Sequence, residues 1–283
     1  MVPATDYEAA AQALSTSGVG GAPPPEDDGE LTAEEAAARE EWFALQERIA
    51  ASTAPRVGFF GDSTATMTGF GVSDWATEHL DLLAPGTGQT DIGCGLVTEV
   101  ARRVDGDVSP INDNCAGWLD RWRAAVESQD LQIAVVQLGP WDVHDTQLDP
   151  GGPFLVVGED PEIDARYAEA LDEAIGVLEA HVETVVLLAS PDVVFGRVDG
   201  RDPPRAREES DPARMAAFRA LLTDAAARHE RTEVLDLAGW VAAQPDDGEL
   251  RPDGVHFTEE TTATVAEWLA PALLEADRTA SGR

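Results

Sequence analysis

Four short apolar runs recur along the chain, separated by longer stretches with helical spacing. The runs fall at residues 57–60, 133–138, 184–189 and 234–237. Continuous runs of Val, Ile, Leu and Phe of this length are typical of strands buried on both faces of a parallel sheet. The stretches between them predict helices over residues 118–128, 163–181, 212–229 and 259–274. A further strand is expected within residues 90–100, where the pattern is weaker.

This alternation predicts a three-layer α/β domain, αβα, with a mostly parallel sheet. In open sheets of this kind, sites form beyond the carboxyl ends of the strands. The loops after the first, second and third apolar runs begin at Gly61, Gly139 and Ser190, and a fourth candidate loop leads into the last helix at residues 251–257. Catalytic or ligand-binding residues are therefore expected in these four loops.

The N-terminal part of the chain has a different composition. Residues 1–30 contain small residues, Gly, Pro and acids with little to bury, which predicts a flexible leader. Thr32 and Glu35 fit a capping box, and Trp42, Leu45 and Ile49 recur at helical spacing after it, so a helix is expected to pack its apolar stripe on the main domain. We therefore divide the chain into an acidic leader with one helix (1–54), a main domain (55–275) and a tail (276–283).

Charge narrows the possible partners. The formal net charge is −35, from 54 acidic and 19 basic residues, and every basic residue is Arg. Such a surface repels phosphate backbones and anionic lipids, so we expect binding neither to nucleic acid nor to a membrane surface. No stretch approaches the roughly 18 apolar residues that a membrane span requires.

The sequence leaves the cellular location open. Its first residues contain no basic start and no apolar core of a secretory signal. This fits an intracellular protein, a piece of a longer exported protein or a misplaced start. Two cysteines, Cys94 and Cys115, are too few for a disulfide framework or a four-ligand zinc site. A single disulfide and two buried free thiols both remain open.

Ser63 is the candidate nucleophile. It follows the first buried strand directly, in the string GDS, where a hydroxyl faces solvent close to free backbone N–H groups. A serine attacks only when a base takes its proton. His256 is the best base among five histidines, since Asp253 precedes it by three positions in a Pro-Asp-Gly turn and can orient the imidazole. The other histidines are His79, His144, His181 and His229.

Two rival chemistries fit the sequence less well. Asp62, Asp142, His144 and Asp145 could be metal ligands, but the Asp-x-His element follows the Gly-Asp element, whereas metallophosphoesterases have the reverse order. A dinucleotide site requires a G-x-G-x-x-G string after the first strand, and the string GDSTATMTGFG does not supply it.

Residues 195–207 contain four Arg in an otherwise acidic chain. This segment follows a predicted strand end. It is either a loop that overhangs the site and clamps an anionic substrate group, or an exposed loop that balances local acids. Its length and Pro content are typical of a lid in both cases.

Taken together, these motifs resemble the SGNH (GDSL-type) hydrolases over residues 55–275. The resemblance is strongest to actinobacterial SGNH domains that occur alone or fused to membrane sugar O-acyltransferases. The matching strings are GDST at 61–64, GCG at 93–95, CAGW at 115–118, GPWD at 139–142 and DGVHF at 253–257. The resemblance implies a flavodoxin-like αβα fold with a five-stranded sheet and a site that needs no metal or organic cofactor.

The resemblance also implies roles for individual residues. Ser63 would be the nucleophile, His256 the general base and acid, and Asp253 its orienting carboxylate. The backbone N–H groups of Ser63 and Gly95 would form the oxyanion hole. The remaining oxyanion and substrate positions are Gly139, Trp141 and Asp142. Trp141 stands where the family has an asparagine, and losing such a donor costs about 100- to 1,000-fold in rate.

The function implied by the resemblance is a serine-dependent ester hydrolase or O-acyl transferase that acts on short acyl groups of carbohydrate, through an acyl-serine intermediate. Its partner would be a small-molecule or glycan ester, with a membrane acyltransferase as a further partner. The alternative is a non-catalytic module that holds a glycan for such an acyltransferase, and Trp141 is the feature that favours it. The family also implies an extracytoplasmic location with Cys94 and Cys115 oxidised.

Overall fold

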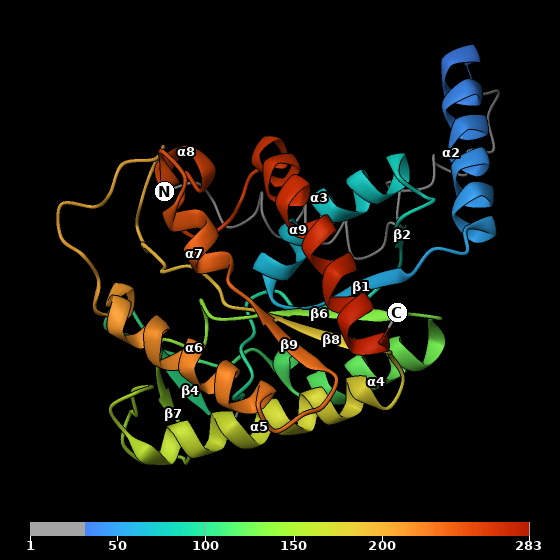
Figure 1. Cartoon of the computed structure of the whole chain (residues 1–283). Helices are drawn as coiled ribbons and strands as arrows, with labels where there is room; N and C mark the ends of the chain where they lie inside the picture. The colour runs from blue at the N-terminus through green and yellow to red at the C-terminus, as the bar shows by residue number, and fades with distance from the viewer. Residues whose placement is uncertain (1–31, 99, 283) are drawn as a thin grey trace.

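The computed structural model describes residues 32–98 and 100–282, and its centre is a parallel sheet with helices on both faces (Figure 1). The strand order is β2-β1-β6-β8-β9, and β3 pairs with the other end of β1 on the same edge as β2. Every pairing in this sheet is parallel. Its strands are β1 (Arg56–Gly61), β2 (Ala84–Pro85), β3 (Gln89–Thr90), β6 (Ile133–Gln137), β8 (Thr184–Leu188) and β9 (Thr232–Leu235). With β2 and β3 counted as one position, this is the flavodoxin-like order, and the predicted three-layer architecture is confirmed.

Helices cover the sheet in two layers (Figure 1). On one face, α3 (Ser63–Glu78) packs against α9 (Glu259–Ser281). The short helices α7 (Leu237–Ala242) and α8 (Asp247–Leu250) precede α9 in the chain. The other face is covered by α4 (Trp118–Ser128), α5 (Pro161–Glu179) and α6 (Pro212–Ala226).

Alternating side chains of each strand pack into two separate hydrophobic cores, because successive residues of a strand point to opposite faces of the sheet. In β6, Ile133 and Val135 pack toward α3 and α9, while Ala134 and Val136 pack toward α4, α5 and α6. Both sets are buried, which explains why the strands appear in the sequence as continuous apolar runs.

Two strand predictions need correction. The strand expected at residues 234–237 is shifted, since β9 ends at Leu235. Asp236 caps α7 by accepting the Gly239 N–H at 2.8 Å, so Leu237 is buried as the first residue of a helix. The strand expected within residues 90–100 is wrong apart from Thr90, which ends β3. Residues 92 and 93 form a turn instead, and none of the described residues from 91 to 98 belongs to a strand.

A second, antiparallel sheet of order β5-β4-β7 was not predicted from the sequence. It consists of β4 (Ala101–Val104), β5 (Asp107–Pro110) and β7 (Asp145–Gln147). The residues of β5 are exposed throughout, so this strand has no apolar run for a pattern to detect. Pairing between β4 and β7, which are distant in the chain, creates the sheet.

The helix predicted after Thr32 is α2 (Ala33–Ala51), and its capping box is confirmed, with Thr32 and Glu35 each accepting the other's backbone N–H. The expected packing of its apolar stripe is confirmed only at Ile49, which is buried. Trp42 and Leu45 are partly exposed, because the first turns of α2 extend away from the sheet (Figure 1).

At the C-terminal end, α9 continues beyond the boundary predicted at residue 275. Ala276 and Asp277 are buried, and Thr184 of β8 donates a hydrogen bond to Asp277 at 3.3 Å. Residues 276–281 therefore belong to the main domain. The flexible leader predicted over residues 1–30 lies outside the described residues. Among the described residues, none of the helices is both long enough and apolar enough for a membrane span.

Candidate active site

Ser63 is the first residue of α3 and follows β1 after a single residue, Asp62. Asp62 is the N-cap of α3: its Oδ1 accepts the Thr64 N–H at 2.8 Å and the Thr64 hydroxyl at 2.6 Å. Complete burial raises the pKa of Asp62, although these hydrogen bonds act in the opposite direction. The first N–H groups of a helix have no acceptor inside the helix, so the Ser63 N–H remains available to a ligand.

Ser63, His256 and Asp253 form a continuous hydrogen-bonded chain. The Ser63 Oγ lies 2.7 Å from the His256 Nε2, although the two residues are 193 positions apart. The His256 Nδ1 lies 2.7 Å from the Asp253 Oδ2. With the Nδ1 proton donated to Asp253, Nε2 presents a lone pair to the Ser63 hydroxyl.

Asp253 is held by its own loop. Its Oδ1 accepts the backbone N–H groups of Val255 at 2.8 Å and His256 at 2.7 Å. Partial burial favours the neutral carboxyl, but hydrogen bonds from the His256 ring and backbone outweigh it and lower the pKa of Asp253. The carboxylate is therefore ionised and can stabilise a charged imidazole.

The other four histidines contact residues other than Ser63. His79 stacks on Trp75, with ring centroids 4.0 Å apart. His229 lies between Asp172 and Glu179, and His181 lies 3.8 Å from Glu127. His144 is buried between aromatic rings, and burial lowers its pKa to about 4. Ser63 and His256 are thus the serine–histidine pair that the fold brings together.

The predicted oxyanion residue Gly95 lies against Asp142, with no room for a side chain. A Cβ at Gly95 would stand 2.5 Å from the Asp142 Oδ1. That oxygen accepts the Leu96 N–H at 2.8 Å, which ties the turn to the loop after β6. Complete burial raises the pKa of Asp142 to about 7, although the nearby Arg102 guanidinium favours the charged form.

A disulfide between Cys94 and Cys115 joins the same turn to the segment before α4. Both cysteines are buried. Arg102 of β4 adds a further contact to this turn, because its Nη2 donates to the Val97 carbonyl at 2.9 Å. Covalent and polar contacts therefore hold the turn that carries Gly95.

Trp141, at the position of the family's asparagine, takes part in aromatic packing. Its ring stacks on His144 with centroids 5.3 Å apart, and the Arg102 guanidinium carbon lies 5.9 Å from the Trp141 ring. Gly139 begins the same loop, and its carbonyl accepts the Asp142 N–H at 3.0 Å. These residues are therefore part of a packed loop at the end of β6.

The candidate metal ligands do not form a cluster. Asp62 bonds to Thr64, and Asp145 pairs with Arg103 at 2.7 Å and Arg214 at 2.8 Å. Within residues 32–98 and 100–282, no three His, Cys, Asp or Glu side chains are grouped so that they could hold a metal ion.

The Arg-rich segment comprises residues 195–207, and one of its four arginines, Arg197, pairs with carboxylates of the protein itself. The side chain of Arg197 is only 7% exposed and pairs with Asp202 and Asp247. Arg207 lies 3.3 Å from Asp105. Arg197 is therefore unavailable to clamp a substrate, because its guanidinium is buried and bonded to protein carboxylates.

Sequence reasoning missed Arg102, Asp247 and Arg251, which support the loops of the site. Arg251 directly precedes the Pro-Asp-Gly turn, but an arginine there carries no signal by itself. Its carboxylate partner lies on α8, a four-residue helix with no periodic pattern. These contacts could be found only from the three-dimensional arrangement.

Comparison with solved structures identifies the fold. The chain is 16% identical to a lipase/acylhydrolase from Enterococcus faecalis, with a TM-score of 0.50 over 78% of this chain and 96% of that one. It is also 16% identical to LAE5, an α/β hydrolase from the metagenome of Lake Arreo in Spain, with a TM-score of 0.50 over 80% of this chain and 99% of that one. A Slackia heliotrinireducens protein described as an SGNH hydrolase aligns with 17% identity and a TM-score of 0.46 over 77% of this chain and 98% of that one.

The chain has the same αβα fold as the lipase/acylhydrolase and LAE5. The αβα fold with a mostly parallel sheet, which the resemblance to the SGNH hydrolases implies, is therefore confirmed. No protein-family model matches the sequence, and no curated protein matches it.

Proposed function

We propose that the chain is a serine-dependent carboxylic ester hydrolase or O-acyl transferase with Ser63 as its nucleophile. The observation that carries this proposal is the chain of two 2.7 Å contacts from the Ser63 Oγ to His256 and from His256 to Asp253. A serine, a base within hydrogen-bond reach and a carboxylate that orients the base are the three parts of an activated nucleophile.

The reaction has two stages. In the first, the Ser63 Oγ attacks the ester carbonyl while its proton moves to the His256 Nε2, and Asp253 stabilises the resulting imidazolium. The C–O bond to the leaving alcohol then breaks, and His256 returns the proton to that alcohol. In the second, water or a sugar hydroxyl gives its proton to the His256 Nε2 and attacks the acyl-Ser63 carbonyl. The bond between the acyl carbon and the Ser63 Oγ then breaks, and His256 returns the proton to the Ser63 Oγ.

The negative charge that develops on the carbonyl oxygen needs fixed donors. We assign the backbone N–H of Ser63, at the start of α3, and that of Gly95 to this role. Asp142 acts indirectly, since it accepts the Leu96 N–H at 2.8 Å and so orients the turn that carries Gly95. Trp141 and Gly139 would form the wall beside the oxyanion at the end of β6.

The substrate class follows from the family resemblance: short acyl groups, acetyl above all, on carbohydrate. Partial exposure of Ser63 and His256 supports access by an ester carried on a larger molecule. Both hydrolysis and transfer to a sugar hydroxyl use the same acyl-serine, so an acceptor screen distinguishes them.

The decisive experiment is labelling with a serine-reactive fluorophosphonate, read by intact mass. We expect one adduct on the wild type, none on Ser63→Ala, and one on Ser73→Ala, a matched control whose serine lies on the same helix. Absence of an adduct on folded wild type would overturn the enzyme proposal. The accessory glycan-holding module would then be the better explanation.

A further inference from the structure

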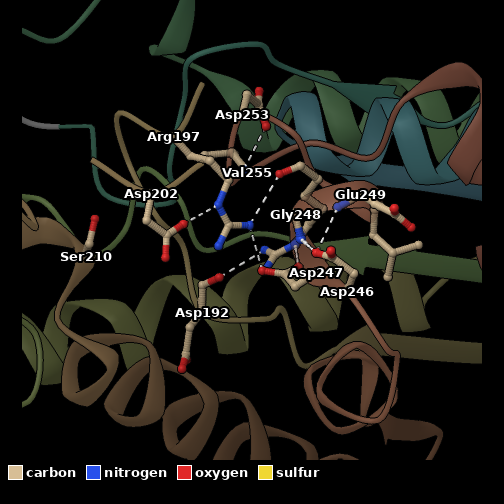
Figure 2. A network of polar contacts seen from close by, with 12 residues as sticks. Asp192, Arg197, Asp202, Ser210, Asp246, Asp247, Gly248, Glu249, Asp253 and Val255 are labelled. Atoms are coloured by element: carbon tan, nitrogen blue, oxygen red, sulfur yellow. Dashed lines mark hydrogen bonds and ion pairs between the residues drawn. The ribbon is translucent and has the colours of Figure 1, made fainter. Parts of the chain in front are cut away.

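The loop that carries Asp253 and His256 has no regular secondary structure of its own. It lies between α8, which ends at Leu250, and α9, which begins at Glu259. Misplacement of a catalytic group by about 1 Å can cost about 100-fold in rate, so such a loop needs support from outside. The structure shows this support as a polar network behind the loop (Figure 2).

Arg251 anchors the start of the loop. Its side chain is 3% exposed. The guanidinium donates from Nε to the Asp247 Oδ1 at 2.7 Å and from Nη1 to the Asp192 carbonyl at 2.9 Å. The first residue of the loop is thereby joined both to α8 and to the segment that follows β8.

Arg197 binds the same carboxylate from the opposite side. Its Nη1 donates to the Asp247 Oδ2 at 2.8 Å, and its Nε donates to the Asp202 Oδ1 at 2.6 Å (Figure 2). Burial raises the pKa of Asp247, but its bonds to Arg251 and Arg197 prevail and lower it. Asp247 is therefore ionised and bridges two buried guanidinium groups, one in the Arg-rich segment and one in the loop.

Backbone hydrogen bonds complete the junction. The N–H of Gly200 donates to the Pro252 carbonyl at 2.9 Å, and the N–H of Val194 donates to the Gly254 carbonyl at 2.9 Å. These carbonyls lie on either side of Asp253. Gly254 has a φ of +81°, and a Cβ there would stand 2.2 Å from the Val194 oxygen, so the two segments touch closely.

We propose that Arg197, Asp247 and Arg251 form a positioning network that holds the Asp253–His256 loop against Ser63. Through Arg197, the Arg-rich segment braces the catalytic loop. Loss of Asp247 leaves two buried guanidinium groups without their shared carboxylate, which is strongly unfavourable, so the loop moves to let them reach water. The catalytic consequence rests on the proposed function, whereas the positioning itself does not.

The test compares Asp247→Asn with Asp172→Asn. Asp172 is a matched control because it also lies between two basic side chains, Arg228 and His229, but on α5 on the other face of the sheet. Hydrogen exchange is measured on peptides that cover residues 194–200 and 251–257. We expect exchange in both peptides to rise at least about tenfold in Asp247→Asn and to stay at the wild-type rate in Asp172→Asn.

Fluorophosphonate labelling gives the second readout. The maximal labelling rate is expected to fall about 10- to 100-fold in Asp247→Asn with little change in the concentration for half-maximal rate, since alignment is lost and not probe binding. Asp247→Glu, which keeps the carboxylate, is expected to restore part of the rate.

The two proposals fail in different ways. Wild-type exchange rates for both peptides in Asp247→Asn would overturn the positioning network whatever the labelling shows. Absence of labelling on wild type would overturn the proposed function, and hydrogen exchange would still decide whether the network positions the loop.

Discussion

Asp253 uses one carboxylate oxygen for the His256 ring and the other for two backbone N–H groups. An asparagine can keep the backbone bonds through its carbonyl oxygen, but it offers the imidazole an amide N–H or a neutral acceptor. We expect Asp253→Asn to fold normally and to react with the fluorophosphonate about 10⁴-fold more slowly than wild type, because the imidazole takes the wrong tautomer.

The measurement is the labelling rate of Ser63, with thermal melting as the check on folding. Asp113→Asn changes an exposed aspartate before α4 and is the control. A labelling rate for Asp253→Asn within about tenfold of wild type would contradict the role assigned to Asp253.

His144 makes the stability of the fold depend on pH. Its pKa is lowered by burial from 6.5 to about 4. Below pH 6.5 the unfolded chain takes up a proton on this ring and the folded protein does not, so this contribution is complete above pH 6.5 and is lost as the pH falls toward about 4. We expect His144→Phe, which keeps an aromatic ring between Trp141 and Phe195, to lose less stability in acid than wild type.

Urea unfolding at about pH 7 and about pH 4.5 measures how much unfolding free energy each protein loses in acid. We expect wild type to lose about 2 kcal/mol more than His144→Phe. Asp142 has a raised pKa and therefore the opposite dependence, since its contribution is lost as the pH rises toward about 7. Because Asp142 is present in both proteins, its contribution cancels in the comparison. Equal losses in the two proteins would show that His144 is protonated in the folded state.

At the scale of elements, the packing of α3 on α9 aligns the two halves of the site. Ser63 begins α3, and α9 follows the loop that carries His256. A Cβ at Gly71 of α3 would stand 2.3 Å from the Thr262 carbonyl oxygen of α9. We expect Gly71→Ala to lower the free energy of unfolding by about 2–3 kcal/mol, because the two helices must separate.

Gly176→Ala is the matched control for this prediction. Gly176 lies inside α5, and a Cβ there meets no atom within 4 Å. We expect it to raise the free energy of unfolding by about 0.5–1 kcal/mol, since Ala favours the helix without a clash. Urea unfolding measures both variants. Equal changes in the free energy of unfolding would show that helix propensity dominates at both positions. The α3–α9 contact would then have adjusted to the added methyl group.

At the scale of the whole molecule, the net charge of −35 opposes the compact state through self-repulsion. The Debye length falls from about 30 Å at 0.01 M salt to about 3 Å at 1 M, so salt screens this repulsion. We expect the midpoint of thermal unfolding to rise by on the order of 5 °C between these salt concentrations.

Differential scanning calorimetry checks this prediction, with a neutral osmolyte at matched osmolality as the control. The ion pairs of Asp247 and Asp145 with buried arginine side chains are screened less than exposed pairs and respond more weakly to salt. A midpoint that falls as salt is added would show that favourable surface ion pairs outweigh the net repulsion.

The sequence by itself determined the central strands of the main sheet, β1, β6 and β8, and the long helices α4, α5, α6 and α9. The residues of β1, β6 and β8 are apolar in succession because both faces of these strands are buried, and this signal is local. The sequence signals for α4 and for the capping box of α2 are local as well. The two residues of the capping box are three positions apart. Ser63, Asp253 and His256 were predicted because each follows a predicted strand or turn with the side-chain chemistry of its role.

Tertiary structure alone decided the contacts between residues far apart in the chain. The pairing of β4 with β7, the burial of Arg197 against Asp247 and the contact of Gly95 with Asp142 join segments about 40–50 positions apart. No local pattern marks these pairs, because hydrophobic periodicity reports whether a residue is buried and not which residue it meets. The contact of Arg197 with Asp247 was therefore decided only when the fold brought the Arg-rich segment beside α8.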